Sequence, residues 1–319
     1  MRALGAIVAA ILALTVADAA DAGGQVRAPR PKRPASAPTR TAAVTAISTT
    51  PSRADLAIEV RSRAVKPGEV LEVTITSPVA LTAVTATLGD RAFPVWAVTS
   101  TSWRGLVGLD ADQGPGPLAL AAGGTRAPGP PLSRTLSLTV MPATFRERRL
   151  TVAPEFVEPP ESERPRIERE AKQLHAIYDH ASADRVPGRF VAPVPHRRSS
   201  PFGSRSIFNG QPRERHSGLD FASPRHAAIH APAAGTVVLV ASLYFTGNTV
   251  VIDHGQGLYS ILAHMTEASV REGQTVAPGD VVGDVGATGR ATAPHLHWSV
   301  RLGGARVDPA SLLDLLGAA

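Results

Sequence analysis

The stretch Pro294-His-Leu-His-Trp-Ser-Val-Arg301 decides the fold assignment for the carboxy-terminal half of this 319-residue chain. On a β-strand, residues i and i+2 point to the same face, with Cα atoms roughly 6.5 to 7 Å apart. His295 and His297 can therefore address one site, where one imidazole binds a metal and its neighbour meets substrate. Eight of the ten histidines lie between His196 and His297, so the candidate chemistry is concentrated in this half.

A second element, His216-Ser-Gly-Leu-Asp220, places an imidazole and a carboxylate four residues apart in a turn that contains glycine. The chain has no cysteine, so any metal must be bound by histidine and carboxylate. A hydrolytic zinc site uses three such ligands and leaves a fourth position for water. His216, Asp220 and one histidine of the pair supply that number, although either motif taken singly is equally compatible with hydrogen-bonded structural histidines.

β-Rich runs and glycine turns make up the rest of this half. The runs at 235–240 and 248–253 are rich in valine, and His254-Gly-Gln-Gly257 is typical of a hairpin turn. The sequence therefore predicts an all-β domain over residues 190–319.

Four other features of this half are weaker candidates. His226 and His230 have a helical spacing but lie in strand-like sequence between prolines, which argues against a second metal site. His254 is interpreted as structural and Ser217 as a turn residue. The glycines at 283–289 lack the Gly-Lys-Ser/Thr of a phosphate loop, so no nucleotide site is predicted.

The segment before this domain is interpreted as a connector over residues 146–189. Ile167, Ala171, Leu174 and Tyr178 fall at the spacing of an amphipathic helix. Proline-rich stretches bracket the helix, so we expect few contacts between the two domains that it joins.

Residues 55–145 are interpreted as an immunoglobulin-like β-sandwich that contains no histidine. Leu71, Val73 and Ile75 alternate with polar residues, as do Leu136, Leu138 and Val140, and turn sequences separate these runs. The absence of histidine suggests a role in targeting or gating.

Residues 23–54 are interpreted as a disordered leader rich in Pro and Ala, which carries six positive charges and no acidic residue. These equal the formal net charge of +6, so the folded part is near neutral. The leader can associate with anionic envelope polymers or serve as a spacer. No aromatic residues interleave its charges, so no nucleic-acid partner is predicted.

Residues 1–22 have the features of a signal peptide: Met1-Arg2, an apolar run over 3–16 and the small-residue pattern Ala17-Asp-Ala19. The run is shorter than the ~20 residues of a spanning helix, although a retained membrane anchor is the alternative. We therefore expect export to the periplasm or the extracellular cell wall, and no transmembrane span in the mature protein.

Taken together, His216-x-x-x-Asp220, Leu262-Ala-His-Met265 and Pro294-His-Leu-His297 resemble the lysostaphin and LytM-type zinc metallopeptidases of the duplicated hybrid motif superfamily. The resemblance covers roughly residues 190–309, and the sandwich also resembles the amino-terminal half of exported members. It implies a carboxy-terminal β-sheet peptidase domain with one Zn²⁺ per chain. The implied zinc ligands are His216, Asp220 and His297, and the implied unligated catalytic pair is His264 and His295.

The chain departs from the family pattern at three positions. Leu262 replaces an aromatic residue, Ala293 a glycine and Ser299 a glutamate. None of these is an implied ligand or catalytic histidine. We expect them to affect the substrate wall and the orientation of a histidine.

The resemblance implies a zinc-dependent endopeptidase that hydrolyses peptide bonds in peptidoglycan stem peptides or cross-bridges. The first expectation is a D,D-cross-bridge and the second a glycyl bond. The alternative is a non-catalytic LytM-like activator of a cell-wall amidase. Such a protein is expected to have lost metal ligands, whereas this chain retains all three implied ligands and both implied catalytic histidines. A wall-anchoring role for the sandwich is compatible with the enzyme.

Overall fold

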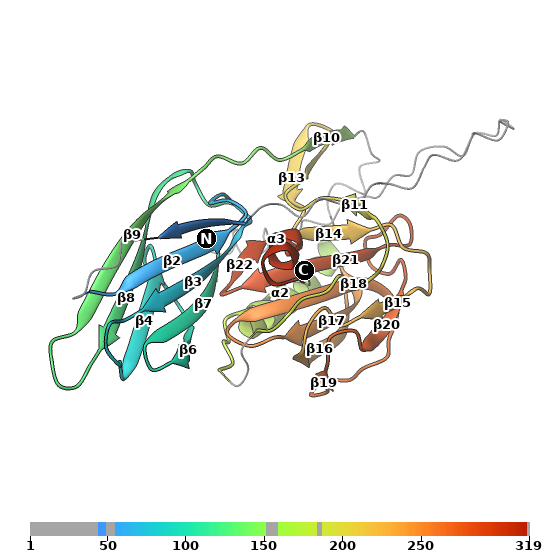
Figure 1. The fold of residues 1–319 in the computed structure, drawn as a ribbon. Coiled ribbons are helices and arrows are strands. Elements are labelled where there is room, and N and C mark those ends of the chain that lie inside the picture. Colours follow the sequence, from blue (N-terminus) through green and yellow to red (C-terminus); the bar gives the residue numbers. More distant parts are fainter. Residues whose placement is uncertain (1–43, 49–54, 151–158, 184–186, 318–319) are drawn as a thin grey trace, which may run out of the picture.

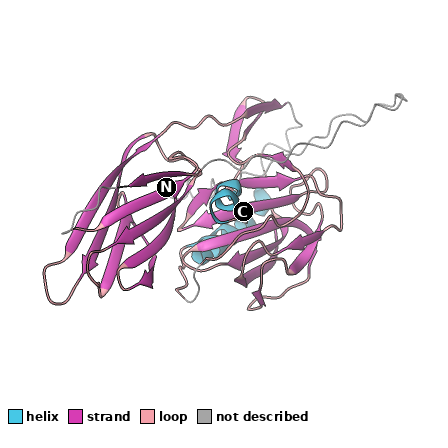
Figure 2. Ribbon diagram, in the orientation of Figure 1, coloured by secondary structure: helices cyan, strands magenta, loops and turns pink. Residues whose placement is uncertain are grey.

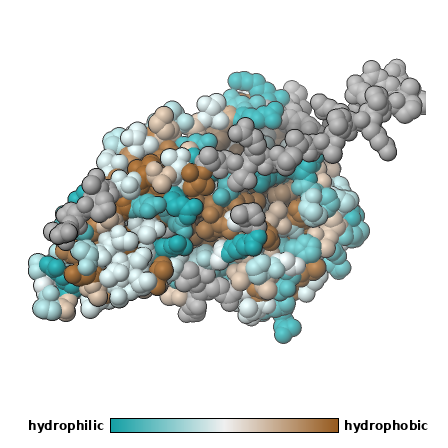
Figure 3. Space-filling model, in the orientation of Figure 1, coloured by the Kyte–Doolittle hydropathy of each residue, from teal (hydrophilic) through white to brown (hydrophobic). Residues whose placement is uncertain are grey.

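The computed structural model describes residues 44–48, 55–150, 159–183 and 187–317. The predicted signal peptide and most of the predicted leader lie outside the described residues. The described chain is almost entirely β-structure (Figure 2), which confirms the predicted all-β fold class. No helix in these ranges is long and apolar enough to cross a membrane. On the face seen in Figure 3, hydrophilic and hydrophobic residues are interspersed over both halves.

The amino-terminal half is a sandwich of two antiparallel sheets (Figure 1). The first has the order β1-β2-β3-β7-β6, formed by β1 (Thr45–Ser48), β2 (Ala57–Ser62), β3 (Val70–Thr76), β7 (Ser102–Gly108) and β6 (Val95–Thr99). The second has the order β5-β4-β8-β9, formed by β5 (Arg91–Phe93), β4 (Ala83–Leu88), β8 (Gly116–Thr125) and β9 (Leu132–Val140). Ile58 and Val60 of β2 are buried against Leu120 and Leu138 of the facing sheet. The immunoglobulin-like type of this sandwich stays a prediction.

Strand β1 lies within the range that the sequence assigned to a disordered leader. Its residues pair antiparallel with Glu59–Ser62 of β2. All four residues of β1 are exposed, and each pairs with a residue of β2. The sequence therefore carried no hydrophobic alternation from which the strand could be predicted.

The connector contains β10 (Glu147–Leu150), a short 3-10 helix (Glu161–Glu163) and α2 (Arg164–Tyr178). Proline in the first turn of α2 suits a helix start, because its missing N–H would have no partner there. The predicted stripe is confirmed, since Ile167, Ala171, Leu174 and Tyr178 are the buried residues of α2. Leu174 and Tyr178 pack on one face of the carboxy-terminal sheet.

The carboxy-terminal half is built on a ten-stranded sheet, most of which follows the order β11-β14-β21-β18-β17-β16-β19. The strands of this path are β11 (Arg198–Ser200), β14 (Gly218–Phe221), β21 (Leu296–Leu302), β18 (Leu258–Ala268), β17 (Gly247–Asp253), β16 (Gly235–Leu243) and β19 (Thr275–Val276). Three more join at its sides: β15 (Ala228–His230), β20 (Val281–Val285) and β22 (Ala305–Val307). A small sheet pairs β10, β12 (Arg205–Phe208) and β13 (Gln211–Arg215), and the described chain closes with α3 (Pro309–Leu316).

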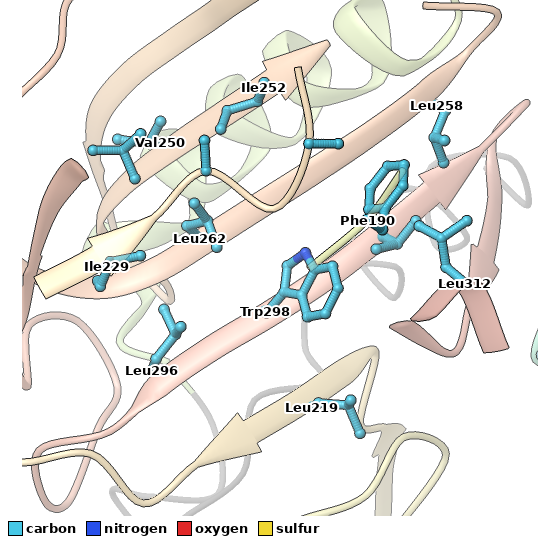
Figure 4. Packing of buried hydrophobic residues seen from close by; sticks show 14 of the residues in the cluster. Phe190, Leu219, Ile229, Val250, Ile252, Leu258, Leu262, Leu296, Trp298 and Leu312 are labelled. Carbon is cyan, nitrogen blue, oxygen red and sulfur yellow. The ribbon is translucent and has the colours of Figure 1, made fainter. Parts of the chain in front are cut away.

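Strand β21 decides which face of the large sheet carries the histidines. Leu296 and Trp298 point into the core, beside Phe190 and Leu262 (Figure 4). Because neighbouring side chains of a strand alternate, His297 projects from the opposite face.

The two halves share one hydrophobic core. Val70, Leu106 and Ala111 of the amino-terminal half belong to the same buried cluster as Val307. A Cβ added to Gly108 would lie 2.5 Å from Cγ1 of Val307, so only glycine fits at this crossing.

Buried ion pairs reinforce this contact. Arg63, whose side chain is 15% exposed, forms salt bridges to Glu69 within the sandwich and to Asp308 and Asp314 at α3. Ser311 donates its hydroxyl to Glu69 over 2.7 Å. The expectation of few contacts between the halves is therefore wrong, because residues far apart in sequence supply them and the connector gives no sign of it.

We predict that Arg63→Met lowers the free energy of unfolding by about 3 kcal/mol or more, because it removes the cation that pairs with the buried carboxylate of Glu69 and with Asp308 and Asp314. The matched control Arg61→Met removes a half-exposed arginine that pairs with Glu72, and we expect a cost of about 1 kcal/mol or less. Denaturant unfolding of both full-length variants measures the difference. Equal losses in the two variants would contradict the structural role of Arg63.

Candidate metal centre and active site

Three predicted residues converge at one point on the large sheet. His216 follows β13, Asp220 lies in β14, and His297 lies directly opposite Asp220 in β21. The Nε2 atom of His216 is 2.9 Å from Oδ1 of Asp220, and Nδ1 of His297 is 2.8 Å from the same oxygen. The two ring nitrogens are 3.0 Å apart. All three side chains are buried.

The tautomer of His216 indicates what this group can bind. Its Nδ1–H donates to the carbonyl of Pro201 over 2.9 Å, and a carbonyl oxygen can only accept. In the neutral ring, Nε2 therefore carries a lone pair that faces the carboxylate of Asp220. Lone pairs converge in this way when a cation lies between them or when one ring is protonated.

The spacing of the three atoms suits a metal ion. Ligand atoms around tetrahedral zinc, at bonds of about 2.0 to 2.2 Å, lie about 3.3 Å from one another. The observed separations of 2.8 to 3.0 Å are close to that value. His216, Asp220 and His297 can thus hold one metal ion with a small outward shift.

The pKa shifts of these three side chains also favour a bound cation. Burial by itself lowers the pKa of His216, but the carboxylate of Asp220 reverses this and raises it. Burial by itself raises the pKa of Asp220, but His216 and His297 hold it well below its usual range. Burial also lowers the pKa of His297. Asp220 is therefore a fixed negative charge that requires a cation beside it.

The two predicted unligated histidines lie next to this group. His264 donates its Nδ1–H to the carbonyl of Thr288, and His295 donates its own to the carbonyl of Ala293, each over 2.8 Å. Both Nε2 atoms are buried and have no hydrogen-bond partner among the described residues. The ring centroids of His264 and His295 are 4.6 Å apart, and Nε2 of His295 lies 3.9 Å from Oδ1 of Asp220.

His264 is neutral in this environment. Burial, with the neighbouring His295 and His297, lowers its pKa to about 3. Since Nδ1 holds the proton, Nε2 presents a lone pair at neutral pH. Such an atom is able to accept a proton from water.

A β-bulge presents His264 to the site. Asn248 pairs with Met265 and Val250 with Leu262, so two residues of β18 stand opposite one of β17. His264 adopts a positive φ of 62°, which non-glycine residues rarely do, and its backbone N–H donates to Thr246. Bulges and strained backbone of this kind re-aim side chains at functional sites.

Residues 286–295, here named the histidine loop, provide the carbonyls of Thr288 and Ala293. The loop is locked against the turn between β16 and β17 by a contact between Gly289 and Gly247. A Cβ at Gly289 would overlap the backbone nitrogen of Gly247 and lie 2.6 Å from the carbonyl oxygen of Phe245. This packing leaves little freedom for the loop and hence for the two rings it orients.

Three other histidines of this half lie outside the site. His226 is exposed, and His230 donates its Nδ1–H to the carbonyl of Gly279. His254 is structural, as predicted: it is buried, donates to the carbonyl of Ala234, and its Nε2 lies 2.9 Å from the hydroxyl of Ser260.

The three residues that depart from the family pattern do not alter the five residues of the site. Leu262 is fully buried in the core, and Ser299 lies beside Gly218 on the paired strand. Ala293 contributes its backbone carbonyl to His295, a contact that does not depend on its side chain. The carbonyls of Pro201, Thr288 and Ala293 are functional groups that sequence analysis missed, because a backbone carbonyl has no signature in the sequence.

Comparison with known proteins identifies the family to which this chain belongs. The model described as Peptidase family M23 matches residues 214–309, a range that contains all five site residues. A solved structure from Pseudomonas aeruginosa assigned to peptidase M23 is 33% identical, with a TM-score of 0.59, and the match covers 78% of this chain and 95% of that one. The chain belongs to peptidase family M23, which confirms the resemblance stated from the sequence.

Curated relatives match over part of this chain. The DD-carboxypeptidase/endopeptidase Mpg of Neisseria meningitidis is 37% identical over 123 residues, which are 38% of this chain and 28% of that protein. The peptidoglycan DD-endopeptidase ShyA of Vibrio cholerae is 37% identical over 93 residues, which are 29% of this chain and 22% of that protein. The match thus spans about a quarter of the length of these relatives.

We predict that Gly289→Ala destabilises the protein by at least about 2 kcal/mol more than Gly210→Ala. Both glycines have a positive φ, so both substitutions carry a similar backbone strain. Only Gly289 has backbone atoms in the space of a Cβ, whereas Gly210 has nothing within 4 Å. Thermal unfolding of both variants measures the difference, and similar melting temperatures would show that the loop contact is not rigid.

Proposed function

We propose that this chain is a zinc-dependent endopeptidase that hydrolyses peptide bonds in the stem peptides or cross-bridges of peptidoglycan. One observation carries the proposal: a group of three converging ligand atoms lies beside two imidazoles whose buried Nε2 atoms have no hydrogen-bond partner among the described residues. A hydrolytic zinc site needs the first group, and acid–base catalysis needs the second.

The substrate class rests on the relatives. The Neisseria protein is named a DD-carboxypeptidase/endopeptidase and the Vibrio protein a peptidoglycan DD-endopeptidase. These names support a D,D-cross-bridge as the first substrate, with a glycyl bond as the second. Peptidoglycan lies outside the cytoplasmic membrane, so the proposal includes export through the signal peptide expected at residues 1–22. It also includes contact of the basic leader with anionic envelope polymers.

The mechanism assigns His216, Asp220 and His297 to hold the zinc ion. When bound there, zinc would supply Lewis-acid chemistry, polarising a peptide carbonyl and making water more acidic. Asp220 keeps its negative charge because its pKa is low, so it offsets part of the charge of the ion. The Nδ1–H of His216, held by the carbonyl of Pro201, directs its other nitrogen to the ion.

His264 and His295 handle the protons. Each has its Nδ1–H fixed on a backbone carbonyl, so Nε2 is the only ring atom free to exchange a proton with substrate or water. One ring accepts the proton of the attacking water. A protonated ring of the pair then stabilises the developing oxyanion or donates a proton to the leaving amine.

The metal assignment predicts that His297→Ala and Asp220→Ala release zinc, because each removes one of three protein ligands. Zinc content per chain of the purified full-length protein, measured by mass spectrometry, gives the result. His230→Ala is the matched control, since it removes a histidine of the same domain that lies outside the metal-binding group and donates to the carbonyl of Gly279. Stoichiometric zinc in both ligand variants would disprove the assignment.

The catalytic assignment predicts that His264→Ala and His295→Ala keep zinc but lose at least ~10²-fold in hydrolysis, the usual scale for a lost general acid or base. Product mass analysis of digested peptidoglycan measures activity and also identifies the bond cleaved. If His295→Ala lost its zinc while His297→Ala kept it, the two histidines would exchange roles. A zinc-loaded wild type that cleaves nothing would favour the amidase-activator alternative.

A further inference from the structure

Three hydrogen bonds from one short segment fix the position of His216. Gly203 donates its backbone N–H to the carbonyl of His216 over 2.8 Å, and the backbone N–H of His216 donates to the carbonyl of Ser204 over 2.7 Å. The ring donates its Nδ1–H to the carbonyl of Pro201 over 2.9 Å. Residues 201–204, here named the ligand-holding turn, therefore determine where His216 lies and in which direction its Nε2 points.

Phe145 packs on this turn from another part of the chain. It lies between β9 and β10, in the segment that leads from the sandwich to the small sheet (Figure 1). A Cβ added to Gly203 would overlap its ring, so the ring occupies the space that a side chain at this position would need. The ring of Phe202 approaches it edge-on, with centroids 6.2 Å apart. Two of the four residues of the ligand-holding turn thus pack against one aromatic ring.

Arg215 contacts the same ring. Its guanidinium carbon lies 4.7 Å from the centroid of Phe145, and Arg215 directly precedes His216. A cation over an aromatic face at this distance is attracted to it, and edge-to-face ring pairs are favourable as well. Phe145 therefore joins the two segments that meet at His216, which are the strand that ends at Arg215 and the ligand-holding turn.

The backbone beside Phe145 is held in the same place. The carbonyl of Arg146 accepts from the backbone N–H of Arg205 over 2.8 Å. From there Glu147–Leu150 pair parallel with Arg205–Phe208, which makes β10 part of the small sheet. Parallel strands cannot be joined by a tight turn, so this pairing brings together segments that are distant in the chain. The sheet itself therefore keeps Phe145 next to the ligand-holding turn.

We propose that Phe145 is a positioning residue for the metal: by packing on the ligand-holding turn and on Arg215, it keeps His216 in the place and orientation that metal binding requires. This inference rests on the proposed function only for the identity of the metal as zinc. Phe145 acts through His216, because Asp220 and His297 are brought together by the pairing of β14 with β21. The unit that binds the metal would thus begin before residue 190, where the sequence predicts the peptidase domain to start.

The test is the zinc dissociation constant of the full-length protein, measured by competition with a chelator of known affinity. We expect Phe145→Ala to weaken zinc binding by about 10-fold or more, because losing the groups that orient a metal-binding histidine typically costs about 10- to 100-fold. Phe145→Tyr keeps the aromatic ring and should remain within about 3-fold of the wild type. Phe145→Leu keeps an apolar side chain without the ring, so its affinity should fall between these two.

Phe93→Ala is the control that separates positioning from stability. Phe93 is a buried ring in the core of the sandwich, whereas Phe145 is half-buried. Its removal should lower the melting temperature at least as much as Phe145→Ala does, yet change the zinc dissociation constant by less than about 2-fold. Equal losses of zinc affinity in the Phe93 and Phe145 variants, or an unchanged affinity in Phe145→Ala, would overturn the proposal.

A metal-free measurement keeps this test independent of the proposed function. In the zinc-free protein, the Nδ1 proton of His216 is held by Pro201 whether or not Nε2 is protonated, and its NMR signal is identified by its loss in His216→Ala. We expect this proton to exchange with solvent at least about 10-fold faster in Phe145→Ala than in the wild type. Equal rates would refute the positioning role even if zinc binds normally. Faster exchange supports it even if the wild type binds no zinc, an outcome that would contradict only the proposed function.

Discussion

The buried carboxylate of Asp220 is the constraint around which the rest of the site is built. An isolated carboxylate at this depth would cost several kcal/mol, so it requires positive or proton-donating neighbours. His216 and His297 supply them, and they lower the pKa of Asp220 although burial alone would raise it. The three residues come from separate segments, and Asp220 meets His297 only through the pairing of β14 with β21. The group therefore exists only once the sheet has formed, which makes the register of these two strands the main determinant of the site.

Backbone carbonyls orient three of the four imidazoles. His216, His264 and His295 each donate Nδ1–H to a carbonyl and direct Nε2 inward. This arrangement fixes the tautomer of each ring without a second carboxylate, so Asp220 is the negative charge nearest to the rings. It also explains why Ala293 serves in place of glycine, since either residue presents the same carbonyl. The position of the loop is set by the contact between Gly289 and Gly247 and by the hydroxyl of Thr288, which accepts from the backbone N–H of Asn248 and donates to the carbonyl of Met265.

The features that could be predicted from the sequence are those with a local periodicity. The i, i+2 spacing of His295 and His297 predicted a common site, and the helical spacing from Ile167 to Tyr178 predicted the buried stripe of α2. Features that depend on contacts between distant segments, or on the backbone alone, could not be predicted. Strand β1 has four exposed residues and therefore no hydrophobic pattern, and the contact of Arg63 with Asp308 joins positions 245 residues apart. The bulge at His264 likewise depends on the register of two strands, which a local sequence pattern does not determine.

The amino-terminal half does not supply a ligand, yet it is coupled to the segment that does. Asp112, in the loop between β7 and β8, accepts from Nε of Arg215 over 3.2 Å and from Arg306 over 2.6 Å. Burial alone would raise the pKa of the neighbouring Asp110, but its hydrogen bonds with Arg306 lower it, so this link stays charged above about pH 4. Arg215 is the last residue of β13 and directly precedes His216. The sandwich therefore contacts the strand that delivers His216 to the metal group, through the residue that directly precedes this histidine.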